Sequence, residues 1–186
     1  MTSGHPAPTP AHPVRTLVLL RHAKAERPDG PVDIDRSLTE RGQADALASG
    51  AWLAGRGLTP DLVICSPSKR TRQTWHGVAQ GLAAGLAAGA SAPRVSYERR
   101  VYDGGADDLL ALVQAVDDEV GTVLLIGHNP SVSVLSARLD PEGAADDSDG
   151  LRTAGLAVHE VTGSWAELGG GPAPVVARHT ARGRSG

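Results

Sequence analysis

The sequence has few of the features that define several large protein classes. It holds one cysteine in 186 residues, so no internal disulfide can form, and we expect a reducing, cytoplasmic environment. It contains no run of about 18 apolar residues that could span a bilayer. The net charge of −3 gives no overall attraction to nucleic acid or to anionic membranes. Any anion site must therefore be local, and we expect neither nucleic acid nor a membrane as a partner.

Patterns that bind metals or nucleotides are also missing. No group of histidines, thiolates and carboxylates has the spacing of a metal site. The glycine-rich segments GGADD and GGGPAP lack the Lys-Ser/Thr ending of a phosphate-binding P-loop. We therefore expect no metal and no cofactor.

Leucine and valine must form the core, because phenylalanine is absent and aromatic residues make up 3% of the chain. Short apolar runs such as LVLL and VLLIG alternate with longer helical patterns, which is typical of an α/β fold. Polar residues do not interrupt these runs, so they suit strands covered on both faces. The sequence predicts a three-layer α/β/α sandwich with a mostly parallel central sheet over residues 15–178, between flexible tails at residues 1–14 and 179–186.

The same patterns predict where the elements lie. Strands are expected near Thr16–Leu20, Leu62–Ser66, Arg94–Tyr97, Val123–Gly127, Leu156–Glu160 and Val175–Ala177. The segment SLTE at residues 37–40 has the spacing of a capping box, which starts a first helix that runs to about Arg56. A second helix begins near Ser68 and enters a segment whose small residues indicate either close packing or a loosely ordered end. Two more helices are expected at Asp107–Asp118 and after GHNPS, and a surface loop at residues 139–150.

Polar residues follow three of the predicted strands. Arg21 and His22 follow the first strand, SPSKR follows the second, and His128 with Asn129 follows VLLIG. Ligands bind beyond the carboxyl ends of strands in an open parallel sheet, so these residues can converge. Arginines and histidines brought together repel one another unless an anion lies among them. Because arginine pairs with phosphate oxygens and a neutral histidine nitrogen can attack phosphorus, we predict a phosphate site.

Four ordered sequence blocks resemble a known family. LRHAKAE is similar to the Arg-His-Gly motif that ends the first strand in the histidine phosphatase (phosphoglycerate mutase-like) superfamily, with Ala23 in place of the glycine. DIDRSLTERG, ICSPSKRTRQT and LLIGHNPSVSVL resemble the next three blocks, and LRTAGLAVHEVTGSWAEL resembles the closing strands. The chain is short and lacks long insertions, so it is most similar to the small SixA-type phosphohistidine phosphatases. Ala23 requires a backbone conformation there that a Cβ can tolerate.

The resemblance implies a role for each residue that matches the motifs. His22 would be the nucleophile that becomes phosphorylated, Arg21 and Arg70 would clamp the phosphate oxygens, and His128 would donate to the same group. Asn129 would bind substrate.

The family spacing Ser-x-x-x-Arg-x-x-x-Thr matches Ser66, Arg70 and Thr74, so it selects Arg70 over Arg72. The two arginines lie about 200° apart around a helix axis, which leaves Arg72 for a peripheral position.

The general acid is less clearly indicated than the other roles. Mutase-like members of the superfamily carry a glutamate after the third strand, and YERRVYDGG offers Glu98 as the catalytic candidate, with Asp103 as the alternative. If neither serves, leaving-group protonation is weak and a phosphoramidate such as phosphohistidine is favoured. Asp33 and Asp35 are expected to shape the loop at the mouth of the site.

The remaining candidates receive structural interpretations. His5, His12 and His179 are expected in tails, His76 on a helix surface, His159 in a strand, and Cys65 in the core.

These observations support three functional hypotheses. The first is a metal-independent phosphatase that works through phosphorylated His22, namely a protein phosphohistidine phosphatase of SixA type. The second is a phosphatase of small phosphomonoesters or nucleotides; a mutase is disfavoured because the chain is short. The third is a phosphate- or phosphopeptide-binding module with weak catalysis, which the nucleophile argues against. The expected partner is a phosphorylated protein or a small phosphorylated metabolite, and the expected state is a monomer.

Overall fold

The computed structural model describes residues 14–27, 30, 32–85, 91–143 and 150–183, and within them a six-stranded sheet lies at the centre. The strands are β1 (Val14–Arg21), β2 (Leu62–Cys65), β3 (Arg94–Tyr97), β4 (Thr122–Gly127), β5 (Gly155–Thr162) and β6 (Val175–Thr180). Their spatial order is β3-β2-β4-β1-β5-β6. The pairs β3–β2, β2–β4 and β4–β1 are parallel, whereas β5 runs antiparallel to both of its neighbours. This arrangement confirms the predicted fold class.

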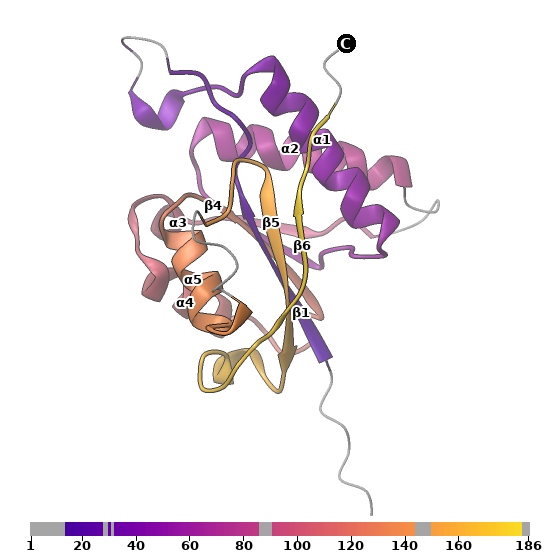
Figure 1. The fold of residues 1–186 in the computed structure, drawn as a ribbon, viewed down its shortest axis with the longest axis vertical. Helices are drawn as coiled ribbons and strands as arrows, with labels where there is room; N and C mark the ends of the chain where they lie inside the picture. Colours follow the sequence, from indigo (N-terminus) through magenta and orange to yellow (C-terminus); the bar gives the residue numbers. More distant parts are fainter. Residues whose placement is uncertain (1–13, 28–29, 31, 86–90, 144–149, 184–186) are drawn as a thin grey trace, which may run out of the picture.

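Helices cover both faces of the sheet, as Figure 1 shows. The helices are α1 (Glu40–Gly55), α2 (Lys69–Gly85), α3 (Arg99–Asp103), α4 (Ala106–Gln114) and α5 (Ser131–Leu139), with short 3₁₀ turns η1 (Asp33–Asp35) and η3 (Trp165–Glu167). Leu17 and Leu19 of β1 face the core under α4 and α5, while the alternate residues Val18 and Leu20 face the core under α1 and α2. Because successive strand residues point to opposite faces, an uninterrupted apolar run fits a sheet covered twice.

The small residues of α1 and α2 allow the two helices to pack closely. A Cβ on Gly81 would lie 2.2 Å from the carbonyl oxygen of Leu47, and one on Gly50 would lie 2.1 Å from that of Val78. No side chain fits at those distances, so the helix backbones meet where the glycines lie. The small-residue segment therefore reflects close packing as far as Gly85; the predicted continuation through residues 86–90 lies outside the described residues.

The first helix begins later than its predicted cap. Thr39 is the N-cap, and its side chain accepts a hydrogen bond from the backbone N–H of Gly42 at 3.0 Å, so the assignment of Ser37 to that role is wrong. The Ser37 carbonyl instead accepts from the Glu26 N–H at 2.9 Å, beside an isolated bridge between Ala25 and Leu38. This pairing holds the chain extended through Leu38, and an extended residue cannot lie inside a helix.

The structure differs from the predicted helices at two further places. The third predicted helix ends at Gln114 and not at Asp118, because the Val116 N–H donates to the Val113 carbonyl at 3.1 Å and so tightens the chain into a turn. Helix α3 was not predicted, since its five residues are too few for a periodic pattern.

The C-terminal boundary also differs from the prediction. Strand β6 continues to Thr180, so the boundary predicted at residue 178 falls inside a strand. His179, expected in a tail, lies opposite Leu156 in the sheet, and its ring stacks on Trp52 with centroids 4.8 Å apart. Residues 1–13, 144–149 and 184–186 lie outside the described part of the chain. None of the helices that the structure describes is long and apolar enough to cross a membrane.

Candidate active site

His22 lies at the carboxyl edge of the sheet, directly after β1. Its backbone N–H donates to the carbonyl of Gly127 in β4 at 3.0 Å, and its carbonyl accepts from the N–H of Ala154 at 3.2 Å. The backbone of His22 is thus held between the segments that end β4 and precede β5. A residue fixed in this way presents its side chain in one place, as a catalytic group requires.

The His22 ring is held in one tautomer. Its Nδ1 lies 2.7 Å from the carbonyl oxygen of Ala23, and because a carbonyl can only accept, Nδ1 carries the proton. Burial lowers the pKa of His22 to about 4, and the neighbouring cations Arg70, Arg21 and Arg36 act in the same direction. The imidazole is therefore neutral near pH 7, and its Nε2 carries a free lone pair, which is the form that attacks phosphorus.

Ala23 accommodates its Cβ, as the sequence comparison required. Its side chain is fully buried, and its backbone N–H donates to Thr74 Oγ1 at 3.0 Å. Among the described non-glycine residues, a positive φ occurs at Ala154 and not at Ala23. The Thr74 hydroxyl also donates to the Arg70 carbonyl at 2.7 Å, so it ties the segment after β1 to helix α2.

His128 lies beside His22, with ring centroids 5.1 Å apart. Its Nε2 lies 2.8 Å from Ser66 Oγ, and Arg70 Nη2 lies 3.3 Å from its Nδ1. A guanidinium only donates, so Nδ1 accepts here and Nε2 donates to Ser66. Burial, followed by the charge of His22 and of Arg70, lowers the pKa of His128 to about 3. Donation from His128 Nδ1 to a phosphate requires the other tautomer, with the Ser66 hydroxyl as donor to Nε2.

Arg21 and Arg70 each bring a buried, unpaired donor to this cluster. Arg21 Nη1 donates to the carbonyl of Leu151 at 2.9 Å, and Arg70 is 6% exposed. The Nε atoms of both residues are buried and have no hydrogen-bond partner among the described residues. A buried donor without a partner is costly, so both atoms favour an anion that can accept from them.

Asp33 is the main residue of the cluster whose contact was not predicted. The sequence placed it at the mouth of the site, and the structure pairs it with Arg70, whose Nη2 lies 2.9 Å from Asp33 Oδ2. Arg36 Nη1 donates to Oδ1 at 2.8 Å, and the Tyr102 hydroxyl donates to Oδ2 at 3.1 Å. The hydrogen bond from Arg36, with those from Arg70 and Tyr102, lowers the pKa of Asp33 to about 2. This carboxylate is therefore ionised throughout the physiological range.

The structure does not bring the two acid candidates to the histidines. Glu98 Oε1 accepts from Ser96 Oγ at 2.6 Å, and Glu98 lines a separate groove of about 550 Å³ beside β3. Asp103 is exposed and pairs with Arg99 at 3.0 Å. The amide of Asn129 is engaged at both ends: Nδ2 donates to Leu151 O at 2.9 Å and Oδ1 accepts from Ser133 at 2.6 Å. Asn129 thus holds the loop that also orients Arg21.

Arg70 and Arg72 lie in different surroundings on α2, with Arg70 buried and Arg72 exposed. The spacing argument separates the two residues in the same way. Among the described residues, no three histidine, cysteine, aspartate or glutamate side chains gather as a metal ion would need.

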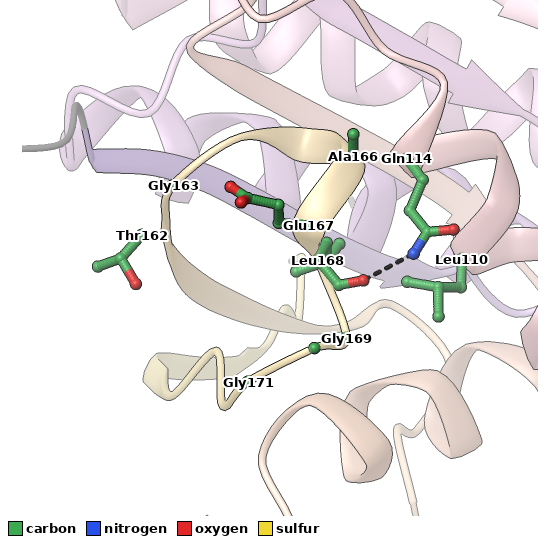
Figure 2. Close-up of a pocket in the computed structure, with 10 residues that line it drawn as sticks. Leu110, Gln114, Thr162, Gly163, Ala166, Glu167, Leu168, Gly169 and Gly171 are labelled. Carbon is green, nitrogen blue, oxygen red and sulfur yellow. Dashed lines mark hydrogen bonds between the residues drawn. The ribbon is translucent and has the colours of Figure 1, made fainter.

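A separate groove of about 740 Å³ lies at the other end of β1 and β5 (Figure 2). Val14, which begins β1, pairs with Thr162, and Thr162 lines the groove. The other lining residues are Leu110, Gln114, Gly163, Ala166, Glu167, Leu168, Gly169, Gly170 and Gly171. The groove therefore lies away from His22, which follows the far end of β1.

Comparison with known proteins shows the family to which the sequence is similar. The model of the Histidine phosphatase superfamily (branch 1) matches residues 17–88. An uncharacterized protein of Mycobacterium tuberculosis (strain H37Rv) is 36% identical over 169 residues, which is 88% of this chain and 100% of the relative.

Two solved structures share the fold. The structure of "Putative Phosphohistidine Phosphatase SixA" from Nakamurella multipartitia is 35% identical, with a TM-score of 0.78 over 92% of this chain and 98% of that chain. The protein histidine phosphatase SixA complexed with tungstate is 24% identical, with a TM-score of 0.70 over 89% of this chain and 96% of that chain.

Proposed function

The chain belongs to branch 1 of the histidine phosphatase superfamily, and we propose on this basis that it is a phosphatase working through a phosphohistidine intermediate on His22. The observation that carries the proposal is the combination of a neutral His22, whose unprotonated Nε2 carries a lone pair, with two arginines whose buried Nε atoms have no partner among the described residues. A nucleophile and preorganised donors for the oxygens of a phosphoryl group are what covalent phosphoryl transfer requires.

The reaction has two displacements at phosphorus. In the first, His22 Nε2 forms a bond to phosphorus, and the bond to the leaving group breaks with its electron pair going to that group. In the second, water attacks phosphorus, inorganic phosphate departs, and Nε2 recovers its lone pair. Arg21 and Arg70 neutralise the oxygens in both steps, and His128 donates from Nδ1 once Ser66 donates to its Nε2. These residues provide the charge neutralisation, so we expect activity without an added metal.

We propose phosphohistidine on a protein as the substrate, because the described residues of the site include no carboxylic acid placed to protonate a poor leaving group. Asp33, with its pKa lowered to about 2, is ionised, and Glu98 contacts Ser96 beside the separate groove. The imidazole of phosphohistidine can already carry the proton with which it leaves. The likeness to the tungstate complex of SixA supports a tetrahedral oxyanion as the bound group, since tungstate has the shape of phosphate. We further propose that the protein acts as a cytoplasmic monomer.

A phosphatase of small phosphomonoesters or nucleotides is the second candidate, and a phosphate-release assay separates the two. The wild-type protein would be given a histidine-phosphorylated protein, sugar phosphates and nucleotides, each with and without EDTA. We expect the highest kcat/KM on phosphohistidine, unchanged by EDTA. Faster release from a sugar phosphate or nucleotide would favour the second candidate. Loss of activity in EDTA that one metal restores would contradict the proposed mechanism.

A further inference from the structure

The guanidinium of Arg70 has one edge that Asp33 occupies. Arg70 Nη1 donates to the backbone carbonyl of Asp33 at 2.6 Å, and Nη2 donates to its Oδ2 at 2.9 Å. The adjacent edge carries Nε, which is buried and unpaired among the described residues, together with Nη2, which also reaches His128 at 3.3 Å. A guanidinium is planar and rigid, so fixing the Nη1–Nη2 edge also fixes the direction of Nε.

We propose that Asp33 is a positioning residue of the phosphate site: it holds Arg70 by one edge so that the Nε edge faces the phosphate oxygens. The inference rests on the proposed function for the identity of the anion. Asp33 thereby acts through Arg70 and does not itself touch the substrate. The short turn η1 becomes part of the site although it carries no group that reacts.

The contacts around Asp33 distinguish it from an ordinary surface ion pair. Exposed pairs contribute little because two mobile side chains must be ordered to form them. The Asp33 side chain is 52% exposed, but that of Arg70 is 7% exposed. Arg36 and Tyr102 hold the two carboxylate oxygens from other directions, and the second bond to Arg70 comes from the Asp33 backbone. The carboxylate is thus held in place by contacts besides those with Arg70.

The alternative interpretation is that Asp33 competes with phosphate for Arg70. A carboxylate can substitute for a phosphate oxygen, and both carry negative charge. The two roles predict opposite changes in phosphate affinity when the carboxylate is removed. If Asp33 positions Arg70, its loss weakens phosphate binding. If it competes, its loss strengthens binding.

The experiment measures binding of inorganic phosphate by titration calorimetry to the full-length protein and to a set of variants. Asp33→Ala should raise the Kd by about tenfold, on the scale of one lost hydrogen bond to a charged group. Asp33→Asn keeps an oxygen for Nη2 and should lose less. Arg70→Ala should bind more weakly than Asp33→Ala. Adding Asp33→Ala to Arg70→Ala should cost little more, because the positioned group is gone.

Asp35→Ala is the matched control, since Asp35 lies in the same turn, is exposed, and its side chain has no ion pair or hydrogen bond among the described residues. Its phosphate Kd should equal that of the wild type, and the melting temperatures should confirm that all variants fold. Unchanged or tighter binding by Asp33→Ala, or a full additive loss in the double variant, would overturn the inference. Failure of the wild type to bind phosphate would contradict the proposed function as well. If the wild type binds phosphate with the expected variant pattern but does not hydrolyse phosphohistidine, the positioning role is supported and the proposed function is contradicted.

Discussion

The two ends of β1 carry different chemistry. At its carboxyl end, two histidines and two arginines converge, and the pKa of His22 falls to about 4 and that of His128 to about 3. At its other end lies a groove of about 740 Å³ whose one charged lining residue, among those described, is Glu167. The eight residues of β1 separate the two ends by roughly 25 Å. The volume of a groove therefore does not indicate a functional site unless reactive side chains converge on it.

The polar groups at the two ends of β1 have different partners. Beside the groove, Gln114 donates to Leu168 O at 2.8 Å (Figure 2), and Trp165 Nε1 donates to Val120 O at 2.8 Å. At the carboxyl end, Arg21 and Arg70 keep buried Nε atoms without partners among the described residues. Unpaired buried donors are rare in proteins and are tolerated where a ligand uses them. Arg15 Nε, near the groove, is also buried without a partner among the described residues, so the unpaired donors mark the site only together with the two histidines.

Replacing His22 should have the largest effect on activity. His22→Ala removes the attacking Nε2 from a side chain at the sheet edge, so phosphate release should fall below about a hundredth of the wild-type rate. Single-turnover and steady-state release assays measure this loss, and circular dichroism checks that the fold is kept. A folded variant with more than that residual rate would argue against covalent catalysis at His22.

Arg70 and Arg72 provide a matched pair on one helix. Arg70→Ala should cost roughly 2–4 kcal/mol of transition-state stabilisation, the scale of a lost preorganised donor. Arg72→Ala, at an exposed position, should keep kcat within a few-fold of wild type. Arg70→Lys should recover little, because an ammonium cannot reproduce the planar fork. Kinetics of the three variants decide the matter, and an inactive Arg72→Ala beside an active Arg70→Ala would reverse the assignment.

Acid should lower the free energy of unfolding through the two histidines of the site. The folded pKa values of His22, about 4, and His128, about 3, lie below the ordinary value of 6.5. The unfolded chain then binds more protons, so the free energy of unfolding falls as pH drops from about 6.5 toward 4. Above pH 6.5 these histidines are neutral in both the folded and the unfolded chain, so they add no further pH dependence to stability. Melting temperatures across this range test the trend, and His22→Gln should flatten it; equal slopes would contradict the assignment of this effect to His22.

A substitution in the groove at the other end of β1 should have the smallest effect on activity. Gln114→Ala removes the hydrogen bond to Leu168 O, so the free energy of unfolding should fall by about 1 kcal/mol. Because the groove lies at the far end of β1, kcat/KM should stay within about twofold of wild type, less than 0.5 kcal/mol. Urea unfolding and phosphate release measure the two quantities. A tenfold loss of activity in a stable variant would mean that the groove takes part in the reaction.

The sheet and the main site residues could be predicted because their signals are local. The uninterrupted run Leu17–Leu20 specifies a strand covered on both faces, and the residues after parallel strands must meet at one edge. His22 and His128 follow directly from that rule. The angular spacing of a helix shows that Arg70 and Arg72 cannot both face the site, and the family spacing from Ser66 to Thr74 selects Arg70.

The remaining features depend on contacts between distant parts of the chain. Asp33 and Tyr102 are 69 residues apart and meet only in the folded protein. The cap at Thr39 depends on the bridge between Ala25 and Leu38, which no local pattern reveals. Glu98 is the carboxylate after the third strand, and its backbone N–H donates to the carbonyl of Cys65 in β2 at 2.9 Å, while its side chain accepts from Ser96. Side-chain direction at an element boundary is set by tertiary packing, so residue type alone could not supply it.

Trapping the covalent intermediate tests the central claim most directly. The protein would be mixed briefly with substrate labelled on its phosphoryl group, quenched in alkali, digested, and mapped by mass spectrometry, with His22→Ala in parallel. The account predicts a label that is stable to alkali and labile to acid, located on His22 and absent from the His22→Ala variant. A label on His128 or on a serine, or turnover in which no phosphorylated residue ever forms, would contradict it.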